Sequence, residues 1–100
     1  MIAQSNVFLK KKILVYGLGK SGLSTFKFLK NKSNIFLYDD YQPKIKTLEI
    51  KKNFISYKNI SNFQFDQIIL SPGIDIDNCK LSKFLKKNYS KIYSDLDVFY

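Results

Sequence analysis

The sequence predicts an α/β fold in which helices cover a doubly wound, mainly parallel sheet of about five strands. Two features indicate this class: short continuous apolar runs alternate with segments of helical periodicity, and the connections between them are short. Continuous apolar runs are typical of parallel strands that are buried on both faces. The chain has 100 residues, which is enough for a single domain.

The first third of the chain contains a strand, a helix and a second strand. Residues 13–16 form an uninterrupted apolar run, which predicts the first strand. From 21 to 31, apolar residues recur at helical spacing and lysines occupy the other positions, so we expect a helix lying on the sheet. Residues 35–38 are the second apolar run, and a right-handed crossover of this length places it parallel to the first strand.

The central segment adds a short helix and an edge strand. Ile45, Leu48 and Ile50 predict a helix between Pro43 and Lys52, beginning just after the proline because proline fits the first helical turn. Residues 54–57 are interpreted as a third, edge-like strand. Residues 61–65 are interpreted as a loop or a single turn.

The last third continues the alternation of strands and helices. Residues 67–70 are another buried apolar run and predict the fourth strand. Three apolar residues at helical spacing predict a third helix over residues 78–88, with its lysines mostly on the outer face. Residues 91–93 are a short final strand, and residues 94–100 are assigned to no element.

Composition narrows the functional classes. The chain has 17 Lys and Arg against 8 Asp and Glu, and all 17 basic residues are lysine. Arginine is the side chain that recognises guanine and binds a phosphate through two hydrogen bonds, and this chain has none. We therefore interpret the lysines as a solvated surface and expect no nucleic-acid partner.

With Cys79 as the single cysteine and no histidine, an internal disulfide is excluded and a metal site is not expected. No apolar stretch approaches the roughly 20 residues that span a bilayer, and the N-terminus lacks a signal-peptide core, so we expect a cytoplasmic protein without a membrane partner.

A glycine-rich turn connects the first strand to the first helix. Gly17 lets the chain turn off the strand, Gly19 removes a Cβ that would block a ligand oxygen, and Gly22 lets the helix pack closely on the sheet. Lys20 adds positive charge, and Ser21 either caps the helix, which is its more ordinary use, or donates to a phosphate. Because backbone N–H groups at a helix start are unpaired, this turn is a candidate phosphate-binding site.

The same segment imitates the end of a P-loop. That motif requires a further glycine five positions before Gly19, where this chain has Leu14 inside the strand. The remaining loop is too short to wrap a triphosphate, so we do not expect an NTPase.

Two more polar clusters follow predicted strands. Asp39 ends the second strand 20 residues after Gly19, where a carboxylate can accept hydrogen bonds from a ribose or a base; its alternative is an ordinary turn residue. Ser71-Pro72-Gly73 follows the fourth strand and forms a rigid turn, either as part of a site or as a plain connection. The carboxyl ends of parallel strands share one edge of the sheet, so all three clusters are expected at that edge.

The glycine turn, Asp39, the Ser-Pro-Gly-Ile turn at 71–74 and the segment Ser-Asp-Leu-Asp-Val-Phe at 94–99 together resemble the N-terminal domain of the Mur ligases of peptidoglycan synthesis. The resemblance runs over residues 10–100. It implies that residues 1–100 are a Rossmann-like domain that holds the UDP end of UDP-N-acetylmuramoyl-L-alanine.

The resemblance also implies roles for the three clusters. The diphosphate would be met by the glycine backbone of Gly17, Gly19 and Gly22 with Lys20 and Ser21, the uracil by Asp39 and Asp40, and the nucleotide pocket would be lined by Ser71, Pro72 and Gly73. Three residues depart from the family pattern: Lys20 stands where some relatives have an apolar residue, Asp40 where they have a small hydroxyl residue, and Asp97 where glutamate is more usual.

The implied activity is ATP-driven amide formation, in which a substrate carboxylate becomes an acyl phosphate and the amine of D-glutamate displaces phosphate. The family holds ATP and magnesium in a central domain and the amino acid in a C-terminal domain. We therefore expect these 100 residues to contain no catalytic or metal-binding residue, to bind no cofactor, to be inactive alone, and to be monomeric.

Two other functions share part of this pattern. An NAD-binding module of a dehydrogenase or a regulatory domain would use the same glycine turn and Asp39. A fold used only as an interaction surface would bind neither nucleotide, and no feature of the sequence supports it.

Overall fold

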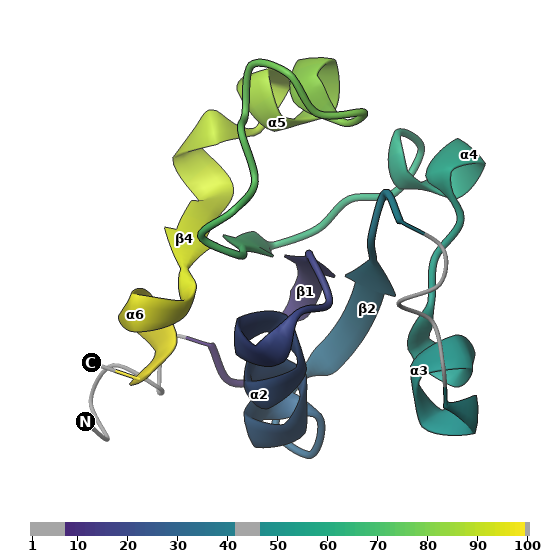
Figure 1. Cartoon of the computed structure of the whole chain (residues 1–100). Coiled ribbons are helices and arrows are strands. Elements are labelled where there is room, and N and C mark those ends of the chain that lie inside the picture. Colours follow the sequence, from purple (N-terminus) through teal and green to yellow (C-terminus); the bar gives the residue numbers. More distant parts are fainter. Residues whose placement is uncertain (1–7, 42–46, 100) are drawn as a thin grey trace.

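The computed structural model describes residues 8–41 and 47–99. Its centre is a sheet of four parallel strands in the order β2-β1-β3-β4. The strands are β1 (Lys12–Tyr16), β2 (Asn34–Tyr38), β3 (Gln67–Leu70) and β4 (Ile92–Ser94). Figure 1 shows this sheet with helices on its two sides, so the predicted α/β class is confirmed.

Alternate residues of the strands supply two separate apolar cores. In β1, Ile13 and Val15 pack in one core and Leu14 and Tyr16 in the other, and all four are fully buried. Because successive side chains of a strand point to opposite faces, a strand with helices on both sides is apolar throughout. The continuous apolar run at residues 13–16 is therefore explained by burial of both faces of β1, as expected.

The helices divide between the two faces. Residues of α2 (Lys20–Leu29), α3 (Leu48–Asn53) and α6 (Asp95–Phe99) contribute to the core around Val15, and residues of α4 (Tyr57–Ile60) and α5 (Ser82–Lys87) to the core around Leu14. A short 3₁₀ helix (Tyr89–Lys91) leads into β4. In Figure 1, α2 and α6 lie side by side, and α4 and α5 lie on the opposite side of the sheet.

The expected edge strand at 54–57 does not form, so the sheet has four strands rather than five. Only Phe54 makes a parallel bridge, to Leu37, and the N–H of Ile55 donates to the Leu37 carbonyl at 3.0 Å. At Ser56 the carbonyl accepts the N–H of Asn59 at 3.0 Å, and the chain turns into α4. This turn buries Ile60 completely, which an extended continuation would not do.

The helix expected between Pro43 and Lys52 is described only in part. Pro43 and Ile45 lie outside the described residues. α3 begins at Leu48, where Thr47 caps it by accepting the N–H of Ile50 at 3.2 Å. Ile50 is buried as expected, but Leu48 is 75% exposed and does not belong to the apolar face.

The C-terminal elements differ from the expected ones at their ends. Residues 78–81 form turns rather than helix, because Asp75 accepts hydrogen bonds from the Asp77 N–H and the Asn78 side chain. α5 is accordingly shorter than predicted. After β4, Ser94 and Asp97 exchange hydrogen bonds in the manner of a capping box, and α6 forms where no element was expected.

Candidate functional site

The strand order places a topological switch point between β1 and β3. The chain leaves β1 toward β2 on one side and leaves β3 toward β4 on the other. Ligands of open α/β sheets bind in the crevice outside the carboxyl ends of strands at such a point. In this protein, the glycine turn follows β1 and the turn beginning at Ser71 follows β3, so both turns lie at this edge of the sheet.

Gly17 and Ser71 join the two turns. Gly17 has a φ of +102°, which only glycine adopts readily, and a Cβ built on it would lie 2.7 Å from the Ser71 Oγ. The Ser71 hydroxyl donates to the Gly17 carbonyl at 2.9 Å, and the Ser71 N–H donates to the Tyr16 carbonyl at 3.0 Å. The predicted sharp turn at Gly17 is confirmed, and Ser71 fixes it.

The remaining glycines fall into two kinds. A Cβ on Gly22 would lie 1.8 Å from the Gly17 carbonyl oxygen, so the third glycine is required for α2 to pack on the turn, as predicted. In contrast, Cβ atoms built on Gly19 and Gly73 would meet nothing within 4 Å. The backbone at these two positions faces open space and is accessible to a ligand.

The start of α2 differs from the expectation for Ser21. The helix begins at Lys20, its N-cap is Gly19, and no side chain caps it, so the prediction that Ser21 caps the helix is wrong. The Ser21 hydroxyl instead donates to Asp95 Oδ2 at 2.6 Å. Lys20 is exposed and forms no ion pair with any residue that the structure describes.

Asp39 fastens the end of β2 to the glycine turn. Its Oδ2 accepts the N–H of Leu18 at 2.6 Å, and its Oδ1 accepts the N–H of Tyr41 at 2.8 Å. The expectation that Asp39 and the glycine turn share one edge is therefore confirmed. The carboxylate holds the turn in place whether or not it also meets a ligand.

Asp40 is held from two sides. The Tyr16 hydroxyl donates to its carboxylate at 2.8 Å, and the Lys80 N–H lies 3.4 Å from its Oδ2. The role of Tyr16 was not predicted. The sequence does place the hydroxyl of Tyr16 at the end of an apolar run. Because a buried tyrosine normally finds a partner for its O–H, this position could have indicated a polar partner nearby.

Two buried tyrosines at this edge have shifted pKa values. Burial raises the pKa of Tyr16 well above its ordinary value, and its hydrogen bond to Asp40 acts in the same direction. Burial raises the pKa of Tyr38 to about 12, and the charge of Asp40 adds to the effect. Both side chains therefore remain neutral at physiological pH.

We expect the free energy of unfolding to decrease between pH 10 and pH 12. Tyrosine ionises near pH 10 in the unfolded chain, whereas Tyr38 ionises at about 12 in the folded one, so its stabilising contribution is complete below pH 10 and is lost above it. Urea unfolding across this pH range measures the loss. An equally steep loss in Tyr38→Phe would attribute the pH dependence to other groups.

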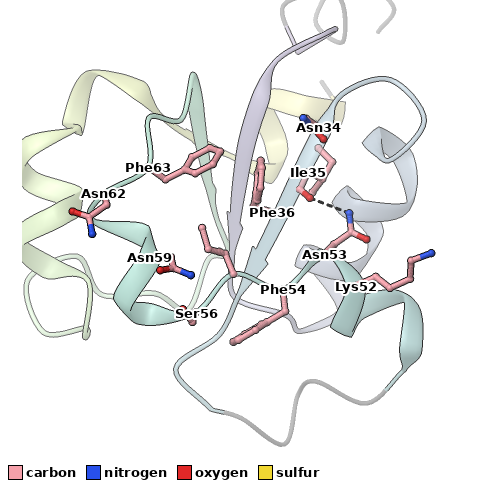
Figure 2. A pocket seen from close by; sticks show the side chains of 11 residues that line it. Asn34, Ile35, Phe36, Lys52, Asn53, Phe54, Ser56, Asn59, Asn62 and Phe63 are labelled. Atoms are coloured by element: carbon pink, nitrogen blue, oxygen red, sulfur yellow. Dashed lines mark hydrogen bonds between the residues drawn. The ribbon is translucent and has the colours of Figure 1, made fainter.

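Among the grooves of the described residues, two larger ones lie away from the glycine turn. The first has a volume of about 710 Å³ and lies at the outer edge of β2, where the Asn53 amide donates to the Ile35 carbonyl at 3.0 Å. Figure 2 shows Phe36 between this bond and Phe63, which also lines the groove. The second, of about 670 Å³, is lined by α4 and α5 and includes Lys80. None of the predicted site residues lines either groove.

Residues 8–41 and 47–99 contain no cluster of three or more His, Cys, Asp or Glu residues able to hold a metal ion. None of the helices in these residues has the length and apolar character needed to span a membrane.

The parallel sheet and the glycine turn at its switch point define a Rossmann-like α/β domain. The family model described as Mur ligase MurD-like, N-terminal domain, matches residues 11–92. The chain belongs to this family.

Curated relatives agree with the family model. The chain is 36% identical over 94 residues to the UDP-N-acetylmuramoylalanine--D-glutamate ligase of Rickettsia bellii, covering 91% of this chain and 21% of the relative. The corresponding ligases of Rickettsia prowazekii and Wolbachia pipientis are 33% and 32% identical over 98 and 100 residues, covering 95% and 96% of this chain and 22% and 20% of those proteins. The chain thus spans about a fifth of the length of these relatives. No solved structure matches it significantly.

Proposed function

We propose that residues 1–100 are the N-terminal domain of a ligase that joins D-glutamate to UDP-N-acetylmuramoyl-L-alanine, and that this domain binds the UDP end of that substrate. Family membership and the names of the relatives support the ligase over an NAD-binding module. The match over residues 11–92 covers the elements that form the candidate site, apart from α6.

One observation carries the assignment of the site. At the switch point, Gly19 and Gly73 leave backbone exposed on the two turns, and Lys20, which has no ion-pair partner among the described residues, stands at the first turn of α2. Backbone N–H groups and the positive end of a helix dipole favour a phosphate at such a position. This arrangement supports a diphosphate that contacts the exposed backbone of both turns.

The residues divide into those that shape the site and those that would touch the substrate. Gly17 and Gly22 set the close packing of the turn. Lys20, Ser21 and the Gly19 backbone would face the diphosphate, Asp39 and Asp40 would meet the uracil, and Ser71, Pro72 and Gly73 would line the nucleotide pocket. Asp40 accepts from the Tyr16 hydroxyl and the Lys80 N–H and can accept a further hydrogen bond, because a carboxylate has about four lone-pair positions.

The chemical step would use residues outside this chain. Amide formation through an acyl phosphate requires ATP and Mg²⁺, and we assign no catalytic residue, cofactor or metal ligand to residues 1–100. We expect the isolated chain to be a monomer without ligase activity and the whole protein to act in the cytoplasm.

Titration calorimetry of the chain with UDP, UDP-N-acetylmuramoyl-L-alanine and NAD tests the proposal. We expect UDP and the full substrate to bind and NAD not to bind. Lys20→Ala should weaken UDP binding by about fivefold because a charge near the diphosphate is removed. Lys27→Ala is the matched control, since Lys27 is exposed in the last turn of the same helix.

The opposite pattern would contradict the proposal. Binding of NAD without binding of UDP would assign the chain to the nicotinamide-binding modules. Binding of neither nucleotide would leave the sheet edge without a nucleotide function.

A further inference from the structure

The hydroxyl of Ser21 is already committed to a carboxylate. It donates to Asp95 Oδ2 at 2.6 Å, and both side chains are half-buried. The two residues lie on α2 and α6, which contact each other, and the buried Phe26 of α2 and Val98 of α6 belong to the same apolar core. The contact therefore joins the glycine turn to the last helix that the structure describes.

This contact conflicts with a phosphate at the same position. A serine hydroxyl has a single proton, and both a carboxylate and a phosphate oxygen only accept hydrogen bonds at neutral pH. Ser21 cannot donate fully to a diphosphate while it donates to Asp95. The negative charge of Asp95 also stands beside the first turn of α2, where the helix dipole would otherwise attract the diphosphate.

We propose that Asp95 is a positioning residue that competes with the diphosphate for Ser21, so that substrate binding transfers the Ser21 hydroxyl from Asp95 to a phosphate oxygen. This inference rests on the proposed function and extends it, because the resemblance gave Asp95 no role. The transfer moves no covalent bond: the Ser21 proton keeps its oxygen and changes its acceptor. When it occurs, the side-chain link between α2 and α6 is released.

To bind UDP, the free chain must therefore break the hydrogen bond between Ser21 and Asp95, which lowers its affinity for UDP. Asp95→Asn keeps an acceptor for Ser21 but removes the charge, and we expect it to bind UDP about fivefold more tightly than the unchanged chain. Uridine, which lacks the phosphates, should bind equally well to both. Asp77→Asn is the matched control because it makes the same change in net charge at an exposed position on a different segment, where Asp77 pairs with Lys86 at 3.2 Å.

A second pair of variants isolates the hydroxyl. In a Ser21→Ala background, the gain from Asp95→Asn should shrink, because no hydroxyl remains to be released. An undiminished gain would mean that Asp95 acts through charge alone and would overturn the transfer of the hydroxyl. Circular dichroism of each variant checks that the overall helix content is unchanged.

The outcomes separate this inference from the proposed function. If the unchanged chain binds UDP and Asp95→Asn binds it no more tightly than Asp77→Asn does, the Ser21–Asp95 contact is only a structural link and the inference is wrong. An equal gain for UDP and uridine would also overturn it, because the phosphates would not be involved. If no variant binds UDP, both the inference and the proposed function fail.

Discussion

Gly22→Ala is expected to destabilise the protein by at least about 3 kcal/mol, a large share of the stability of a small domain. The added Cβ would lie 1.8 Å from the Gly17 carbonyl oxygen and 3.2 Å from the Ser71 Oγ. Neither the backbone of the turn nor Ser71 can move freely, because Ser71 is bonded to the Gly17 and Tyr16 carbonyls. α2 must therefore shift away from the sheet and lose contacts in the core.

Urea unfolding followed by circular dichroism measures this effect. Gly73→Ala is the matched control, since a Cβ there meets nothing within 4 Å, and its free energy of unfolding should change by less than about 0.5 kcal/mol. Similar stabilities for the two variants would mean that the packing of α2 on the turn is looser than the structure indicates.

Gly19→Asp is expected to separate stability from binding. Gly19 is the N-cap of α2, has an ordinary extended backbone, and leaves the helix without a side-chain cap. Aspartate is among the best N-cap residues, so stability should stay constant or rise by up to about 1 kcal/mol. UDP affinity should fall more than about tenfold, because a carboxylate would occupy the position proposed for a phosphate.

Gly19→Asn distinguishes charge from bulk in the same experiment. Asparagine caps a helix about as well but carries no charge, so calorimetry should give it a UDP affinity between those of the glycine and aspartate forms. Unchanged UDP binding by Gly19→Asp would place the diphosphate away from this turn.

Sequence patterns predicted the structure correctly where an element depends on one continuous apolar run. β1, β2 and β3 were predicted nearly to the residue because each contains an uninterrupted apolar run that is largely buried on both sides. The turns at Gly17 and Ser71 were predicted because they contain glycine and proline, which are disfavoured inside helices and strands. Their meeting at one edge then followed from the parallel arrangement of the strands.

The errors occurred where local hydrogen bonds compete with apolar periodicity. Residues 54–57 were interpreted as an edge strand, but the turn at Ser56 into α4 buries Ile60 and leaves a single bridge. α6 was missed although Ser94 and Asp97 have the spacing of a capping box, because the following apolar residues were too few to show a helical period.

The side-chain partners within the site could not be predicted. The bond between Ser21 and Asp95 joins residues at opposite ends of the chain, and that between Tyr16 and Asp40 depends on how adjacent strands are aligned. Such pairs follow from the three-dimensional arrangement of elements that a single sequence does not specify. The capping role expected of Ser21 was also wrong, because the helix begins at Lys20, one residue before the predicted start.

The central place of β1 also affects how the molecule is made. β1 is synthesised first, yet one of its edges pairs with β2 and the other with β3, which leaves the ribosome much later. Until then a strand that is apolar from Ile13 to Tyr16 has one unpaired edge, and parallel pairing over long separations is slow to form. The nascent chain is therefore exposed to aggregation during this interval, and it is then that chaperones would be needed.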